Sequence, residues 1–281
     1  MHEPSFALLE TLGAQALTRL GADVQGLRLK RVVFGLFFTG VILNNGACGL
    51  AATPIKEIPF AVCCPSSAQA FSMSGKLAGK TVQDVLRDLS HPQALRRTLA
   101  LATLNALAET LLQRDGLAAH ETLSTGDSFD SVRIQADDKV VLIGAFGPYI
   151  KALRKAAQDF RILEYDTSTL RADELQFHVP NERAHEALAW ADVVIATGTT
   201  LLNGSLAGLL RAIRPHAEVA LIGPSVPLLS KPLAQAGITL LGGARVVEPQ
   251  ACLDLLAEGA SGYHLFERSI ARVNLRIRNS D

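Results

Sequence analysis

The sequence predicts an α/β fold in which a smaller N-terminal α+β domain precedes a doubly wound, mostly parallel sheet. From about residue 137 onward, short apolar runs alternate with helical segments. This alternation requires crossover connections, and so indicates a parallel sheet with helices on both faces. The first hundred residues instead join apolar, β-rich stretches by tight turns. We therefore place the smaller domain at residues 1–100 and the α/β domain at 101–281.

The composition is that of a globular protein. Apolar residues make up 48% of the 281 residues and charged residues 19%, which is enough for sizeable cores. Lys plus Arg equals Asp plus Glu at 27 each, so the charge balance argues against nucleic acid as a partner. We expect no membrane span and no signal peptide, because no apolar run reaches about 18 residues and the N-terminus lacks the required pattern. Four cysteines do not make a disulfide framework, so we expect a cytoplasmic location.

The N-terminal elements follow from apolar spacing and turn residues. Residues 5–20 repeat apolar side chains at helical spacing. Residues 27–53 are rich in Val, Phe, Ile and Leu, and Asn-Asn-Gly at 44–46 is typical of a hairpin turn, so we expect two or three antiparallel strands. A short helix is predicted at 81–89. A longer one at 92–114 has Leu and Ala on nearly every face, which predicts burial.

The C-terminal elements are predicted from the alternation itself. Apolar runs bounded by glycine or polar residues predict strands at 139–144, 161–166, 192–197, 218–225 and 238–247. Helices are predicted between and after them at 148–160, 182–191, 203–213 and 227–237. The last segment, 266–279, carries alternating charges and is interpreted as a surface helix or as a tail used in contacts within a homo-oligomer.

Three predicted strands end in loops that combine glycine with small hydroxyl side chains, at 143–149, 196–205 and 222–227. Ligands of open parallel sheets bind beyond the carboxyl ends of the strands, and helix N-termini there attract anions. Simple turns and helix caps are the competing interpretation. We expect a site for a polar or anionic small molecule at this edge, formed by Gly144, Phe146, Gly147, Thr197, Gly198, Thr199, Thr200, Asn203, Gly223 and Ser225.

A nucleotide cofactor is the alternative ligand for this edge. Gly144 and Gly147 do not complete the dinucleotide fingerprint, but Glu164 follows Gly144 by 20 residues. An acid at about that distance contacts a ribose hydroxyl in nucleotide-binding domains, and Asp166 is an equivalent candidate. For each of them, a carboxylate in a solvated loop is the competing interpretation. The pattern leaves open a nucleotide-dependent oxidoreductase or transferase.

Several segments in order resemble a known family. They read VVLIGAFGPYIKAL, ILEYD, ADVVIATGTTLLNGSLAGLL, VALIGPSVPLL and GITLLGGARVV. Together they resemble an uncharacterised prokaryotic family labelled putative heavy-metal chelation proteins, mainly through TGTTLLNGS and GPS-x-P. The resemblance implies a Rossmann-like domain, a smaller domain like the enolase N-terminal cap, and a cleft between them, but no reaction. We expect the loop at 197–205 to face this cleft, together with the segment at 43–54, which contains Asn45 and Cys48.

Metal binding and catalysis have less support from the residues themselves. The sequence contains no C-x-x-C and no H-x-x-x-H. A composite metal site from Cys48, Cys63 and Cys64 is an alternative to cysteines that pack as small apolar residues. The sequence also lacks G-x-S-x-G and the phosphate loop, so we predict no catalytic residue and leave enzymatic activity open. The cofactor is left open between a divalent metal and a nucleotide, and a non-catalytic chelator is a further alternative.

Overall fold

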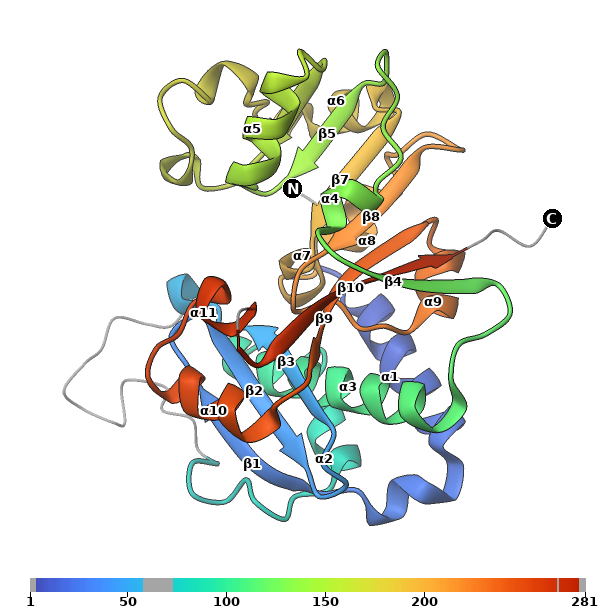
Figure 1. The fold of residues 1–281 in the computed structure, drawn as a ribbon, viewed down its shortest axis with the longest axis vertical. Coiled ribbons are helices and arrows are strands. Elements are labelled where there is room, and N and C mark those ends of the chain that lie inside the picture. The colour runs from blue at the N-terminus through green and yellow to red at the C-terminus, as the bar shows by residue number, and fades with distance from the viewer. Residues whose placement is uncertain (1–3, 58–72, 267, 278–281) are drawn as a thin grey trace.

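The structure, a computed structural model, describes residues 4–57, 73–266 and 268–277. It contains a three-stranded antiparallel sheet and a seven-stranded, mostly parallel sheet, which confirms the predicted fold class (Figure 1). The strands are β1 (Leu29–Phe34), β2 (Phe38–Leu43), β3 (Cys48–Ala52), β4 (Glu121–Thr125), β5 (Val140–Ile143), β6 (Phe160–Leu163), β7 (Val193–Thr197), β8 (Glu218–Ile222), β9 (Leu240–Val246) and β10 (Ile270–Ile277).

Helices surround both sheets (Figure 1). They are α1 (Ala7–Leu20), α2 (Val82–Leu86), α3 (Ala94–Asp115), α4 (Ser128–Ser131), α5 (Gly147–Lys155), α6 (Ala184–Trp190), α7 (Thr199–Leu202), α8 (Leu206–Leu210), α9 (Ser230–Gln235), α10 (Pro249–Ala257) and α11 (Gly262–Phe266). Short 3₁₀ helices are η1 (Gly21–Gly26), η2 (Ile55–Glu57), η3 (Thr167–Thr169), η4 (Leu175–Phe177) and η5 (Asn181–Arg183). No helix in the described ranges has both the length and the apolar character needed to cross a membrane.

The three-stranded sheet has the order β1-β2-β3 and lies directly on α3. The predicted hairpin joins β2 to β3, and Gly46 takes the positive φ, 92°, that this turn requires. Gly49 lets β3 approach α3, because a Cβ atom there would collide with backbone atoms of Ala102 and Ala106. Much of α3 is buried, as its Leu and Ala content predicts. The helix continues without a break through residue 100, where the sequence suggested a domain boundary.

The seven-stranded sheet has the order β4-β10-β9-β8-β7-β5-β6. The strands from β9 to β6 are parallel, and all five predicted strands of this region are present. The chain runs from β5 to β6 in one direction, then crosses back to β7 on the other side of β5. This reversal is the switch point of a doubly wound sheet, where the loops after β5 and β7 diverge and leave room for a ligand.

The C-terminal segment corrects the prediction for 266–279. Instead of a surface helix or tail, it forms β10, which pairs antiparallel with both β9 and β4. Val273, Leu275 and Ile277 are buried on one face of the strand, whereas Arg272 is exposed and Arg276 half-buried on the other, so the charged residues follow the period of a strand. The predicted helix at 203–213 is shorter in the structure, where α8 covers Leu206–Leu210. A separate short helix, α7, precedes it and ends at Leu202, before Gly204 with its positive φ.

The chain returns to the three-stranded sheet near its end. Helix α10 packs on β1 and β2, where Gly40 leaves room for the side chains of Leu253 and Leu256. Cys48 of β3 and Cys252 of α10 lie in the same buried apolar cluster. The sheet is therefore covered by α3 on one face and by α10 from the C-terminal part of the chain on the other, as Figure 1 shows.

Candidate functional site

A cleft of about 350 Å³ lies between the carboxyl ends of the parallel strands and the three-stranded sheet. One wall comes from the loops after β5, β7 and β8, and consists of Phe146, Thr197, Gly198, Thr199, Ile222, Gly223, Pro224 and Ser225. The other wall is formed by Phe37, Phe38, Ala52 and Gly262. In Figure 1, α11, which contributes Gly262 to the lining, is drawn below α5, which begins directly after Phe146. It has the size of a small-molecule pocket and sits at the switch point of the sheet.

Glycines let the three loops lie against one another. Gly144 has φ 111°, and a Cβ atom there would come within 3.1 Å of the Thr197 methyl group. A Cβ atom on Gly198 would come within 2.8 Å of a Val226 methyl group, so this position has no room for a side chain. The Gly198 N–H donates to the Ile222 carbonyl at 2.8 Å, which extends the pairing of β7 and β8 into the loops. The cleft floor is therefore held rigidly.

The threonines of the loop after β7 divide into two groups. The Thr200 hydroxyl is buried and donates a hydrogen bond to the Thr197 carbonyl at 2.6 Å. It therefore stabilises the loop and does not line the cleft. The Thr197 and Thr199 hydroxyls lie 3.2 Å apart and both residues line the cleft, where Thr199 is exposed. These two hydroxyls can offer hydrogen bonds to a bound molecule.

Aromatic rings form the apolar surfaces of the cleft. Phe146 stacks on Tyr149 with ring centroids 5.1 Å apart and planes 6° apart, and the Phe129 ring lies 4.8 Å from that of Tyr149 at a tilt of 40°. Burial, together with nearby Asp127, raises the pKa of the Tyr149 hydroxyl above its usual range. On the opposite wall, the Phe37 side chain is 47% exposed. The lining thus combines exposed aromatic surface with a few hydroxyls, the usual composition of a ligand pocket.

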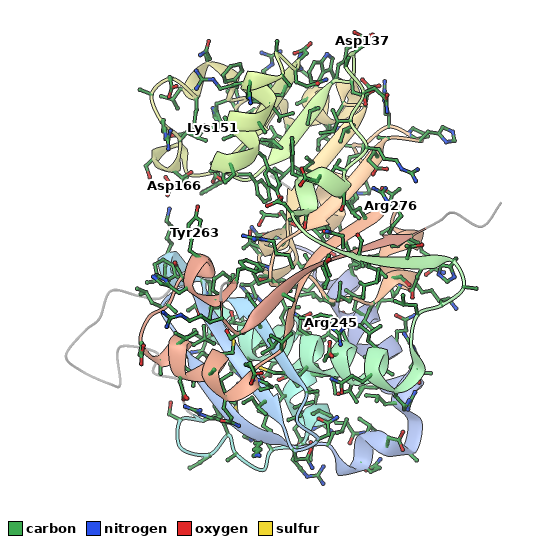
Figure 2. The ribbon with its side chains drawn as sticks, in the orientation of Figure 1. Asp137, Lys151, Asp166, Arg245, Tyr263 and Arg276 are labelled. Carbon is green, nitrogen blue, oxygen red and sulfur yellow. The ribbon has the colours of Figure 1, made fainter. Side chains whose placement is uncertain are left out.

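Two polar contacts join the walls. The Ala52 N–H donates to the Ser225 hydroxyl at 2.8 Å. Outside the lining, the Lys56 ammonium of η2 forms an ion pair with Asp166 after β6, and the hydrogen bond from Lys56 lowers the pKa of that carboxyl to about 2. In Figure 2 Tyr263 of α11 lies below Asp166, and the Tyr263 side chain is 74% exposed.

The two predicted acids lie beside the cleft and not in its lining. The Glu164 carboxylate accepts a hydrogen bond from the Asp166 N–H at 2.9 Å. The Asp166 carboxylate in turn accepts from the Ser168 N–H and hydroxyl, at 3.1 and 2.6 Å. Both side chains therefore close turns after β6 while keeping part of their surface free. Gly147 is the first residue of α5 and also lies outside the lining.

The two predicted asparagines lie away from the cleft. Asn45 sits at the tip of the β2–β3 hairpin, the opposite end from Phe38 and Ala52, and its amide donates to the Thr110 hydroxyl at 3.0 Å. Asn203 accepts from the Ser205 N–H at 3.0 Å and shapes the turn between α7 and α8. Both asparagines therefore stabilise turns, the role that Asn commonly has beside glycine.

Sequence reasoning placed the segment at 43–54 in the second wall of the cleft, and its Ala52 does line the cleft, but Phe37, Phe38 and Gly262 were missed. Phe37 and Phe38 follow Gly35 in a tight turn, where the Gly35 N–H donates to the Phe38 carbonyl at 3.0 Å. Two adjacent aromatic residues in a turn are a signal that at least one ring is exposed. Gly262 comes from α11, which the sequence analysis did not predict.

The described residues do not fit a heavy-metal centre. They contain no group of three or more His, Cys, Asp or Glu side chains placed to hold a metal ion. Burial raises the pKa of the Cys48 thiol far above its usual range and that of Cys252 to about 11, so both are protonated at neutral pH. Metals bind the thiolate form. Cys63 and Cys64, the other predicted ligands, lie outside the described residues.

Known structures share this fold over nearly the whole chain. A protein of unknown function from Pyrococcus horikoshii aligns with a TM-score of 0.75 and 18% identity, covering 96% of this chain and all (100%) of the other. A second, from Desulfitobacterium hafniense, aligns with a TM-score of 0.66 and 20% identity over 92% of this chain and 98% of its own. At these identities the likeness shows the fold alone.

Comparison of sequences gives the family. The uncharacterised protein MJ0500 of Methanocaldococcus jannaschii is 22% identical over 97% of this chain and 99% of its own length. The DUF4213 family model, described as "Putative heavy-metal chelation", matches residues 17–108. The DUF364 model, with the same description, matches residues 127–275, which is more than half of the chain. The chain therefore belongs to the DUF364 family, as its resemblance to the heavy-metal chelation proteins predicted.

Proposed function

We propose that this protein binds a small polar or anionic molecule in the cleft between its two sheets. The observation that carries the proposal is the position of the Thr197 and Thr199 hydroxyls at the switch point of the sheet, opposite Phe37. Ligands of doubly wound sheets bind at this point. The cleft volume, about 350 Å³, suits a molecule of metabolite size.

The lining also limits how the ligand is held. Among the described lining residues none carries a titratable side chain, so hydrogen bonds to the ligand come from hydroxyl and backbone groups. Phe146 and Phe37 offer flat apolar surface on opposite walls. A molecule with a planar or apolar part and one polar or anionic group matches this arrangement.

The test is to locate binding by NMR, with ATP, NAD, S-adenosylmethionine and a set of small carboxylate and phosphate fragments. Chemical-shift changes should concentrate at residues 144–147, 197–199 and 223–225. Thr199→Val should weaken a bound fragment about tenfold through loss of one hydrogen bond. Thr122→Val, on exposed β4, is the matched control and should leave affinity unchanged. Shift changes confined to other regions, or full affinity in Thr199→Val, would contradict the proposal.

A second candidate is a nucleotide-dependent oxidoreductase or transferase. One observation favours it. Glu164 directly follows β6 and lies beside Gly144, which directly follows β5 and has a positive φ. In nucleotide-binding sheets these two positions meet the ribose and the phosphates. Under this candidate, Glu164→Ala lowers affinity for NAD or S-adenosylmethionine at least tenfold, while Glu182→Ala on the surface does not. Equal affinities in the two variants would exclude this role for Glu164.

A further inference from the structure

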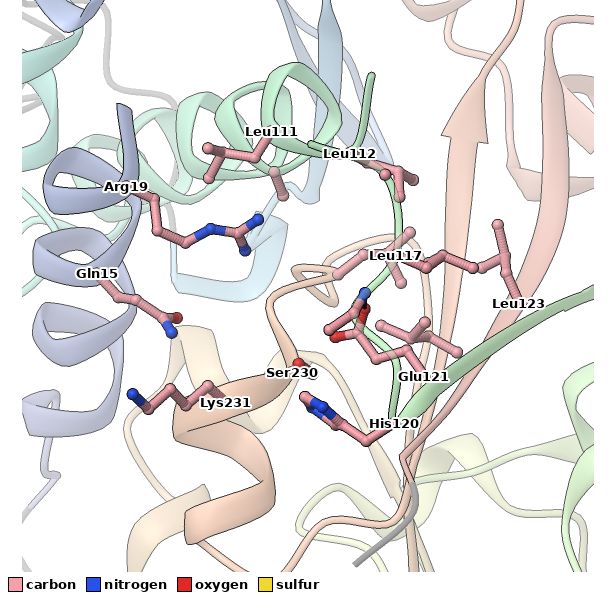
Figure 3. Close-up of a pocket in the computed structure, with 15 residues that line it drawn as sticks. Gln15, Arg19, Leu111, Leu112, Leu117, His120, Glu121, Leu123, Ser230 and Lys231 are labelled. Carbon is pink, nitrogen blue, oxygen red and sulfur yellow. Dashed lines mark hydrogen bonds between the residues drawn. The ribbon is translucent and has the colours of Figure 1, made fainter. Parts of the chain in front are cut away.

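A second cavity of about 200 Å³ lies away from the cleft and shares no lining residue with it. It is enclosed by α1, the end of α3, the segment at 116–123 and the start of α9 (Figure 3). These elements are far apart in the sequence, and none of the motifs identified above falls in the cavity. One water molecule occupies about 30 Å³ in the liquid, so the cavity has room for about seven waters, or for a ligand of roughly eight non-hydrogen atoms.

Leucine is the commonest residue in the cavity wall, with six of the fifteen lining residues. The side chains come from α3, from the loop and strand that follow it, from the segment before α9 and from β10; they are Leu111, Leu112, Leu117, Leu123, Leu228 and Leu275. Leu117 stands at the opening and is 42% exposed. A wall of this kind favours the hydrocarbon part of a ligand, because burying each methylene group contributes about 0.8 kcal/mol.

One side of the cavity carries polar groups with unused hydrogen-bonding capacity. Lys231 is exposed and makes no hydrogen bond or ion pair with any residue that the structure describes. The buried Gln15 side-chain oxygen also lacks a partner among the described residues. In Figure 3 the Gln15 amide and the Lys231 ammonium lie at the same end of the cavity. Because no partner fixes the amide, either its oxygen or its NH₂ group can face the space.

The charges around the cavity favour an anion. Arg19 donates to Asp115 from one terminal nitrogen, at 2.9 Å, and lines the cavity with Lys231. The acid in the lining, Glu121, accepts a hydrogen bond from the Ala118 N–H at 2.8 Å and so holds the turn before β4. Arg19 is therefore already paired with Asp115, and Lys231 is the lining cation without an ion-pair partner among the described residues.

We propose that this cavity is a second binding site, for a small amphiphilic monocarboxylate. The hydrocarbon chain lies among the leucines, the carboxylate pairs with Lys231 and Arg19, and the Gln15 NH₂ group donates to a carboxylate oxygen. A chain of about six carbons fills the volume. The site is independent of the cleft, so a test of the cavity does not depend on the proposed function of the cleft.

The experiment is a titration of the whole protein with hexanoate, followed by NMR. Shift changes should appear at Gln15, Leu117 and Lys231 and should saturate. Acetate lacks the hydrocarbon chain and hexanol lacks the charge, so each should bind at least tenfold more weakly than hexanoate. Lys231→Gln should weaken hexanoate binding about tenfold, through loss of a charge-assisted contact.

Matched variants separate the site from general surface effects. Lys151→Gln, on exposed α5 outside the cavity, should bind hexanoate as the wild type does. Leu117→Ser changes an exposed position at the opening and should weaken hexanoate more than acetate. Hexanoate that fails to bind, that binds Lys231→Gln with wild-type affinity, or that shifts only cleft residues would overturn the proposal.

Discussion

The Ala52 N–H donates a hydrogen bond to the Ser225 hydroxyl at 2.8 Å, which ties the last residue of β3 to the loop after β8. Ser225 is 2% exposed, so water does not compete for this bond. Both residues also line the cleft. The contact therefore holds the two cleft walls together at this point, and the ion pair of Lys56 with Asp166 forms a second link, from η2 to the turn after β6.

Ser225→Ala should destabilise the protein by about 1–3 kcal/mol, because it leaves the Ala52 N–H without its partner in a region that excludes water. Urea unfolding measures the change in the free energy of unfolding. Ser124→Ala, on the exposed face of β4, is the control and should stay within about 0.5 kcal/mol of the wild type. Equal small losses in both variants would show that the bond contributes little.

The Asp166 carboxyl should titrate near pH 2 in the folded protein, because the Lys56 ammonium stabilises its charged form. Its pKa is depressed, so any stability it contributes is present above its unfolded pKa, near 3.9, and is lost as the pH falls towards 2. Carboxyl NMR measures this midpoint. Lys56→Gln should move it upward, whereas Lys30→Gln, on exposed β1, should not. If the Asp166 carboxyl of Lys56→Gln titrated at the same pH as in the wild type, the hydrogen bonds from Ser168 alone would account for its lowered pKa.

The parallel part of the fold could be predicted because its information is local. An apolar run followed by glycine and a helix start specifies a covered strand, and β5, β7 and β8 each have this pattern. Parallel strands place their carboxyl ends at one edge, so the approach of Phe146, Thr197 and Ser225 to a common cleft follows from topology. Six of the predicted site residues line that cleft: Phe146, Thr197, Gly198, Thr199, Gly223 and Ser225.

The remaining features depend on contacts between distant segments. Nothing local in residues 249–266 shows that α10 and α11 return to the three-stranded sheet. The opposite cleft wall at Phe37 depends on that packing. The alternation in β10 has the period of a strand, but its charges also suit a surface segment, and only pairing with β9 and β4 decides between them. Asn45 was misplaced because a hairpin has two ends and the sequence does not say which one faces the cleft.

Gly49→Ala should destabilise the protein by about 3 kcal/mol or more, because the added methyl group meets the backbone of α3 and not a flexible side chain. Strand β3 and helix α3 would have to move apart to make room for it. Gly26→Ala is the matched control, since no atom lies within 4 Å of a Cβ placed there. Thermal and urea unfolding compare the two. A Gly49→Ala protein as stable as Gly26→Ala would show that β3 and α3 are not in direct backbone contact.

Arg245→Leu should lower the free energy of unfolding by about 3 kcal/mol, because it leaves the Glu109 carboxylate buried without its cation. Both carboxylate oxygens accept from Arg245, at 2.8 and 2.6 Å, and the Glu109 side chain is 8% exposed. The same pairing raises the pKa of Arg245 above its usual range.

The pH dependence of this loss distinguishes the cause. Without Arg245, the charged form of the buried Glu109 carboxyl has no cation to offset its desolvation, and a buried unpaired charge destabilises the folded state. Urea unfolding should therefore show a larger loss at pH 8 than at pH 5. Arg211→Leu, exposed on the surface, should show little loss at either pH. A pH-independent loss in Arg245→Leu would point to packing instead of charge.

Cys48 and Cys252 should resist thiol reagents in the folded protein and react fully once it unfolds. Their side chains are 4% and 0% exposed, and the pKa of the Cys252 thiol, about 11, keeps it protonated until strongly alkaline pH. The variant that combines Cys63→Ser with Cys64→Ser leaves only this pair, so reagent consumption can be counted in native and denaturing buffer. Rapid modification in native buffer would contradict the burial of these thiols.

The same double variant tests the family's heavy-metal description on this chain. A thiol binds Zn²⁺ or Cd²⁺ after losing its proton, and protonated, buried Cys48 and Cys252 resist that loss at pH 7. Calorimetric titration should therefore find no sulfur-dependent Zn²⁺ binding once Cys63 and Cys64 are replaced, whatever the wild type binds. Cd²⁺–thiolate absorbance that persists in the double variant would show that the buried pair opens to metal. Its loss, from a wild type that shows it, would place the donor set at residues 63 and 64.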